Sequence, residues 1–171
     1  LFSSMLTCLC VIVSGAVAFG LWETLVYRFL LNANEDMAWG LGLVIPFGVT
    51  LVITRVIADL VVPKNLEFGD VENFVGGAAF GLASGVITVG ILVLSLSYFR
   101  MGPALLGYSP VTDNNGKLVY KSSLWVPVDM LTVKFYEHVS NGAFGTPTPL
   151  ADRMPSLHQQ AALQRMVFVD T

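Results

Sequence analysis

The segment Phe74–Phe99, FVGGAAFGLASGVITVGILVLSLSYF, decides the fold because it holds 26 successive residues without a charge. A helix that crosses a membrane needs about 20 predominantly apolar residues. Two further uncharged runs, Leu1–Trp22 with 22 residues and Met37–Thr54 with 18, have comparable lengths. The shorter run reaches a spanning length if it continues through Arg55 to Val62. The sequence therefore predicts three transmembrane helices.

The composition agrees with a chain that lies in a bilayer. Apolar residues make up 54% of the 171 residues and charged residues 12%, against about 25% charged residues in a typical soluble domain. The mean hydropathy is +0.70. The nine Lys and Arg residues are scattered along the chain, without the basic stripe that nucleic-acid-binding proteins carry. We expect the lipid bilayer as a partner and no nucleic acid.

The runs and the links between them set the expected domains. A transmembrane domain over residues 1–99 is predicted, with helices over about 2–31, 37–62 and 71–98. The opening run has no basic start and no obvious A-x-A cleavage site, so it does not resemble a signal peptide. We expect a further membrane helix upstream of Leu1. The short polar link NANEDM makes the first two helices an antiparallel hairpin.

Residues 100–171 form a tail of different character, with prolines, glycines and a DNNG turn. We expect a small hairpin or an irregular loop with its turn at Asn114–Gly116. An amphipathic helix is predicted over about 128–141, and a short helix over about 156–166. The predicted fold class is an all-α membrane protein with a small mixed C-terminal domain outside the membrane.

Aromatic and ionisable residues mark the expected membrane boundaries. Trp and Tyr are enriched where membrane helices meet the headgroups, which predicts interface anchors at Trp22, Tyr27, Trp39 and Tyr98. Ionisable residues within membrane helices are candidates for functional sites. These candidates are Arg55 and Asp59, four residues apart near the end of the second helix, and Glu23 at the opposite interface. Their alternative role is that of anchors or an ion pair.

Glycine recurs every fourth residue in the third helix, at Gly77, Gly81 and Gly85. In water each glycine weakens a helix by roughly 1 kcal/mol relative to alanine. In lipid, small residues let helices approach closely and so favour their association. Together with Ser84, the three glycines predict a helix-packing face. This face packs against a helix of this chain or of another subunit, or it lines a pore or a substrate path.

The stretch GAAFGLASG resembles a helix of the colicin V production family of bacterial membrane proteins, which typically reads DRLLGAVFGLLRG. The matching positions are Gly77, Phe80, Gly81, Leu82 and Gly85. The tail resembles a branch of that family with an extra C-terminal domain. The resemblance implies about four membrane helices in a bacterial inner membrane, and a link to colicin V export and envelope homeostasis.

This chain departs from the family pattern at three positions. Asn73 and Phe74 stand where the family has Asp-Arg, and Ser84 stands where it often has Arg. Any role of those charges does not carry over to this chain. The family is linked to no established reaction, so the resemblance implies a fold more than an activity.

No residue pattern points to catalysis or metal binding. An intramembrane protease needs an activated serine and a buried histidine, but Ser84 lacks the G-x-S-G spacing, and His138 and His158 lie in the tail. Cys8 and Cys10 are unsuitably spaced for a metal site. We expect neither an enzyme nor a cofactor.

The expected function is therefore that of a structural or accessory subunit of a membrane assembly, whose partners are other membrane subunits or further copies of the chain. The alternative is an oligomeric channel or transport component, with Arg55, Asp59 and Thr50 along a polar path. An intramembrane enzyme ranks third. The absence of a basic cluster favours a tail on the outer side.

Overall fold

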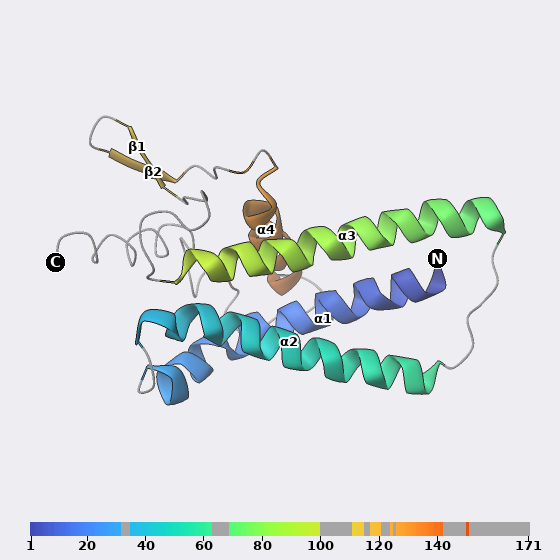
Figure 1. Cartoon of the computed structure of the whole chain (residues 1–171), viewed down its shortest axis with the longest axis horizontal. Helices are drawn as coiled ribbons and strands as arrows, with labels where there is room; N and C mark the ends of the chain where they lie inside the picture. Colours follow the sequence, from blue (N-terminus) through green and yellow to red (C-terminus); the bar gives the residue numbers. More distant parts are fainter. Residues whose placement is uncertain are drawn as a thin grey trace.

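The computed structural model describes residues 1–31, 35–62, 69–99, 111–114, 117–120, 124, 126–141 and 150. Three long helices lie side by side in it, namely α1 (Phe2–Leu25), α2 (Glu35–Val61) and α3 (Asp70–Ser97) (Figure 1). The first of them continues into a π-helix, η1 (Val26–Leu30). All three are long and apolar enough to cross a membrane, which confirms the prediction of three helices of spanning length.

The helix ends follow local chemistry. The third helix begins at Asp70, one residue before the predicted start, with Gly69 as its N-cap and no side-chain cap bond. Asp70 and Glu72 both lie in the first turn, where negative charge interacts favourably with the helix dipole. Pro46 lies inside α2, which continues past it to Val61.

Each of the three long helices contacts the other two. The C-terminal ends of α1 and α3 lie at the same end of the bundle as the start of α2 (Figure 1). Side chains from all three helices fill the interior. Trp22, Leu43, Ile91 and Leu94 are each at most 1% exposed, so large side chains at this end form one shared core.

Two glycines of α2 allow the helices to approach closely. A Cβ at Gly40 would lie 2.9 Å from the carbonyl oxygen of Ser95 in α3. The Ser95 hydroxyl donates a hydrogen bond of 2.8 Å to the Gly40 carbonyl. A Cβ at Gly42 would overlap the side chain of Val26. Helix α2 thus has a glycine where it contacts α3 and another where it contacts η1.

The tail contributes three described elements. Strands β1 (Val111–Asn114) and β2 (Lys117–Tyr120) pair antiparallel, with Asn114 opposite Lys117. The turn was expected at Asn114–Gly116, and of these three residues 115 and 116 lie outside the described residues. Helix α4 (Val128–Asn141) covers the range in which the sequence predicts an amphipathic helix. The short helix predicted over 156–166 lies outside the described part of the chain.

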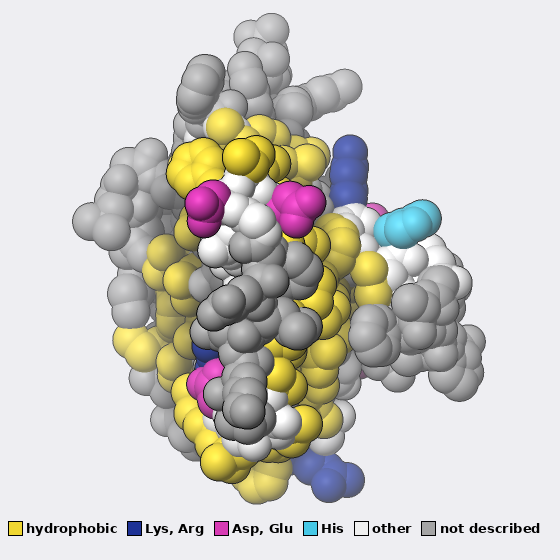
Figure 2. All heavy atoms as spheres, turned by 90° about the vertical axis from the view of Figure 1, so that its right-hand side faces the viewer, with side chains coloured by type: hydrophobic (Ala, Val, Ile, Leu, Met, Phe, Trp, Pro, Cys, Tyr) yellow, Lys and Arg dark blue, Asp and Glu magenta, His cyan; other side chains and the backbone are white. Residues whose placement is uncertain are grey.

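The surface of the bundle is mostly apolar. Exposed large side chains include Val52, Ile57 and Leu60 on α2, and Phe74 and Leu82 on α3. Seen from the end at which α1 begins, hydrophobic side chains cover the flanks, and the charged ones are few (Figure 2). A flank of this kind fits contact with lipid chains, which are as apolar as leucine.

We predict that Gly40→Ala destabilises the bundle. The added methyl group would meet the Ser95 carbonyl oxygen at 2.9 Å and the Phe99 ring at 3.0 Å, and overpacking of this kind costs typically about 1–3 kcal/mol. The measurement is the midpoint of unfolding in a denaturing detergent. Gly48→Ala is the matched control on the same helix, since a Cβ at Gly48 has no described atom within 4 Å. Equal midpoints for the two variants would contradict the prediction.

Candidate functional site

A polar stripe runs along α1. Ser3, Thr7, Cys10 and Ser14 recur every three or four residues, so they share one face of the helix. In its inner part, the Ser14 hydroxyl is fully buried and lies 3.3 Å from the Thr54 hydroxyl of α2. Each hydroxyl also donates to a carbonyl of its own helix, Ser14 to Cys10 at 2.6 Å and Thr54 to Thr50 at 2.8 Å. The stripe therefore belongs to the contact between α1 and α2.

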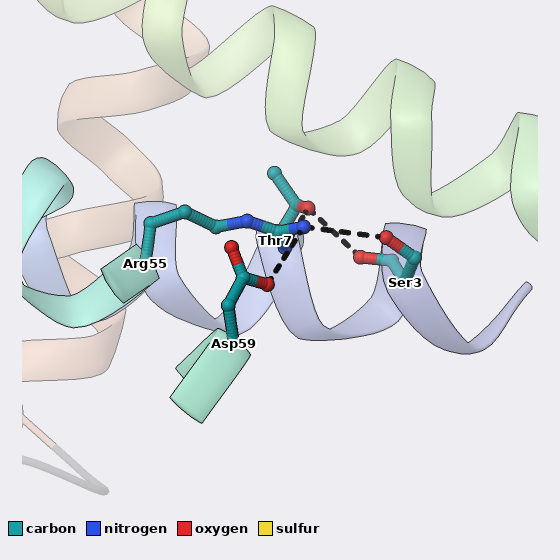
Figure 3. Close-up of polar contacts among 4 residues, drawn as sticks. All are labelled: Ser3, Thr7, Arg55 and Asp59. Carbon is teal, nitrogen blue, oxygen red and sulfur yellow. Dashed lines mark hydrogen bonds and ion pairs between the residues drawn. The ribbon is translucent and has the colours of Figure 1, made fainter. Parts of the chain in front are cut away.

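Near the start of α1, the stripe binds the side chain of Arg55 from α2 (Figure 3). Its guanidinium donates to the Thr7 hydroxyl at 2.8 Å and to the Ser3 hydroxyl at 3.4 Å. The Asp59 carboxylate lies 3.1 Å from the same guanidinium. The Arg55 side chain is 35% exposed and that of Asp59 58%. The structure thus brings together the predicted pair Arg55 and Asp59, and adds two hydroxyl groups that the sequence analysis did not single out.

This arrangement joins two helices near one end of the bundle. Arg55 lies six residues before Val61, where α2 ends, and Ser3 lies one residue inside α1. An arginine near a membrane boundary can keep its charged head close to water while its stem lies along apolar surface. Where both partners are described residues, Arg55–Asp59 is the one ion pair. Glu23, the third predicted polar residue, lies toward the opposite end of α1 and is not part of this cluster.

The four predicted interface anchors gather at the other end of the bundle. The Trp22 ring lies 4.9 Å from the Tyr98 ring and 6.1 Å from the Trp39 ring, measured between centroids. The Trp22 indole N–H donates to the Trp39 carbonyl at 2.8 Å. Tyr27 is 64% exposed, whereas Trp22 and Tyr98 are 0% and 2% exposed. The interior positions of Trp22 and Tyr98 differ from the expected lipid-facing belt, because their rings fill the core that three helices share.

The glycine face of α3 is open over most of its length. No described atom lies within 4 Å of the Cβ position at Gly81 or Gly85, while the Cβ position at Gly77 lies 3.7 Å from the Ser4 hydroxyl of α1. Ser84 points to the interior, and its hydroxyl donates to the Gly81 carbonyl at 2.9 Å. The structure therefore separates Ser84 from the glycines with which it was grouped.

Other glycines form the close contacts with α4. A Cβ at Gly90 of α3 would lie 2.6 Å from the Val128 carbonyl oxygen and would overlap Thr132. A Cβ at Gly15 of α1 would overlap the Tyr136 ring. The sequence analysis missed both positions, because each glycine stands outside the repeat. The available signal was a glycine within a long apolar run.

The hydroxyl group of Tyr136 anchors α4 to α1. It donates toward the carbonyl oxygens of Val11 and Ile12, at 3.4 and 3.3 Å. The Tyr136 ring also lies 5.0 Å from that of Phe19, measured between centroids. Only 2% of Tyr136 is exposed. The fourth helix is therefore fixed against the bundle by a buried side chain that both packs and hydrogen-bonds.

Residues with catalytic or metal-binding chemistry stay apart. Among the residues that the structure describes, no three His, Cys, Asp or Glu side chains form a group that could hold a metal ion. Cys8 and Cys10 are free and buried. His138 lies on the exposed side of α4, and His158 lies outside the described residues.

Comparison with known proteins gives no relative. No protein-family model, curated protein or solved structure matches this chain. The resemblance to the colicin V production family therefore rests on the residues quoted above.

We predict that Arg55→Ala destabilises the bundle more than Asp59→Ala does. Arg55 connects α2 to two hydroxyl groups of α1, whereas Asp59 is 58% exposed and bonds within its own helix. In a double-mutant cycle with Thr7→Ala, we expect a coupling free energy of about 0.6 kcal/mol, the average for hydrogen bonds between membrane helices. The measurement is unfolding in a denaturing detergent.

The matched control for this cycle is Thr24→Ala. Thr24 is an exposed threonine near the other end of α1, and distant sites contribute additively to stability. A coupling with Thr7 no larger than that with Thr24 would show that the contact between Arg55 and Thr7 contributes nothing to stability.

Proposed function

We propose that this chain is an integral membrane protein of the colicin V production type that serves as a structural or accessory subunit of a membrane assembly. Three helices of the chain are long and apolar enough to span a membrane. The role as a subunit of an assembly is supported by one observation, the open glycine face at Gly81 and Gly85 of α3.

The glycines of the three long helices differ in whether another part of the chain contacts them. At Gly15, Gly40, Gly42 and Gly90 a Cβ would meet atoms of a neighbouring helix at 3.1 Å or less. At Gly81 and Gly85 it would meet no described atom within 4 Å. Association between membrane helices relies on close packing at small residues. A surface of two glycines one turn apart, next to the exposed Ala78, supports contact with a further helix.

The proposed partner is a membrane helix of another subunit or of a second copy of this chain. Gly20 and Gly48 are also open, but each is the one open glycine of its helix in the described part of the chain. The repeat on α3 provides a longer flat strip than either of these. The proposed location is a bacterial inner membrane, with the end of the tail on the outer side.

The test replaces Gly81 with Leu in the full chain. The isobutyl group would fill the strip, so we expect the complex purified in mild detergent to lose its partner. The measurement is the mass of the complex. A partner in multiples of 18.5 kDa is a second copy, and any other mass is a different subunit. Gly48→Leu is the matched control and should leave the mass unchanged. A complex of unchanged mass with Gly81→Leu would contradict the proposal.

A second candidate function is an oligomeric channel or transport component. The observation that favours it is the polar contact between α1 and α2, which includes the half-exposed Arg55 and the buried Ser14. Its test is ion flux through vesicles that contain the purified chain. Reproducible flux of the wild-type protein that is abolished by Arg55→Ala would support this candidate and contradict the accessory role.

A further inference from the structure

Helix α4 contacts the bundle far from the helix ends. Gly15 of α1, against which Tyr136 of α4 packs, lies near the middle of the span Phe2–Leu30. At a rise of 1.5 Å per residue, it is about 20 Å from either end. Gly90, the contact of Val128 and Thr132, lies seven residues before the end of α3, or about 10 Å. The fourth helix therefore crosses two predicted membrane spans well inside them.

Charged side chains of the bundle bracket this level on both sides. Arg55 bonds to Thr7, eight residues before Gly15, and Glu23 lies eight residues after Gly15. The distance along α1 from Thr7 to Glu23 is about 24 Å. The hydrocarbon core of a bilayer is about 30 Å thick. A core that covers the uncharged part of α1 therefore includes the level of α4.

The exposed apolar side chains on the far side of α4 favour a position inside the bilayer over one on the membrane surface. If the bilayer ended below α4, the part of the bundle beyond Gly15 and Gly90 would stand in water. That part carries Leu21, which is 46% exposed, and Leu92, which is 41% exposed. Burying these side chains in lipid is favourable, and the bilayer that covers them also covers α4.

We infer that α4 is embedded in the membrane, where it lies across α1 and α3, so that the chain re-enters the bilayer after α3. This differs from the expected tail outside the membrane. The occupant of its outward face is lipid: Leu131, 49% exposed, contacts acyl chains. Lys134 and His138 lie on the same exposed face, and a lysine at this depth extends its ammonium group toward the headgroups.

The contacts hold α4 at this depth. Thr132 and Tyr136 occupy the spaces that Gly90 and Gly15 leave open, and they are 1% and 2% exposed. A helix held only by the membrane surface would bury an apolar face in lipid and keep its polar face in water. Helix α4 is instead held by protein contacts: Asp129, Thr132, Val133 and Tyr136 are buried, and Leu131, Lys134 and His138 lie on the exposed face. The inference does not depend on the proposed function, because it concerns α4 and not the glycine face.

The experiment measures the depth of α4 in phosphatidylcholine vesicles that contain the full chain. In a Cys8→Ala, Cys10→Ala background, Leu131→Cys carries an environment-sensitive fluorophore. Two reference positions are Val89→Cys in α3, one residue before Gly90 and 49% exposed, and Val61→Cys at the end of α2, 72% exposed. Quenching by nitroxides on the acyl chains is compared with quenching by aqueous iodide.

We expect the Leu131 probe to behave like the Val89 probe, with strong acyl-chain quenching and iodide quenching several-fold below that of the Val61 probe. A Leu131 probe that iodide quenches as strongly as the Val61 probe would overturn the inference. This comparison has a different readout from the complex mass in the preceding subsection, so the two proposals fail separately.

A second variant tests whether the glycine contact sets the depth. Gly90→Leu would displace Thr132, so iodide quenching of the Leu131 probe should rise several-fold. Gly48→Leu, open in the structure, should leave it unchanged. The Val89 and Val61 probes in the same variants report whether the bundle keeps its position in the membrane. Unchanged iodide quenching of the Leu131 probe in Gly90→Leu would show that this contact does not hold α4 in the bilayer.

Discussion

Close approach of backbones, made possible by missing side chains, is the constraint on which the rest of this structure depends. Membrane helices gain nothing from leaving water once they are in lipid, so they are held together by packing and by hydrogen bonds between helices. Gly40 meets the carbonyl of Ser95, and Gly90 meets that of Val128. Where the backbones come this close, a serine hydroxyl can reach across to a carbonyl, as Ser95 does toward Gly40.

At the end of the bundle where α1 and α3 end, the helices are held together by large side chains that pack against small ones. The Trp22 indole fills the space between three helices and donates its N–H to the Trp39 carbonyl. Gly42 has no side chain at the point where the large side chains of Trp22 and Val26 pack against α2. The opposite end relies on polar contacts instead, with Arg55 between Thr7 and Asp59. One bundle thus uses two modes of attachment, packed aromatic side chains at one end and polar contacts at the other.

The existence of the three long helices follows from the sequence because length and hydropathy alone determine it. The direction in which each helix faces does not follow, because a helix that is apolar all round has no polar face to orient it. For this reason Trp22 and Tyr98 were expected at the lipid boundary although they lie in the core. Arg55 and Asp59, four residues apart on one helix, could be paired from their spacing. Their hydroxyl partners on α1 depend on how two helices face each other.

The contact between Tyr136 and Val11 joins residues 125 positions apart. A membrane protein is made from its N-terminus, so the hairpin of α1 and α2 exists before α4 has been synthesised. Until then, the space beside Gly15 has no side chain of α4 to fill it. Helix α4 closes this space once residues 128–141 have been made. The packing of α1 around Gly15 is therefore completed by a segment that is synthesised more than 100 residues later.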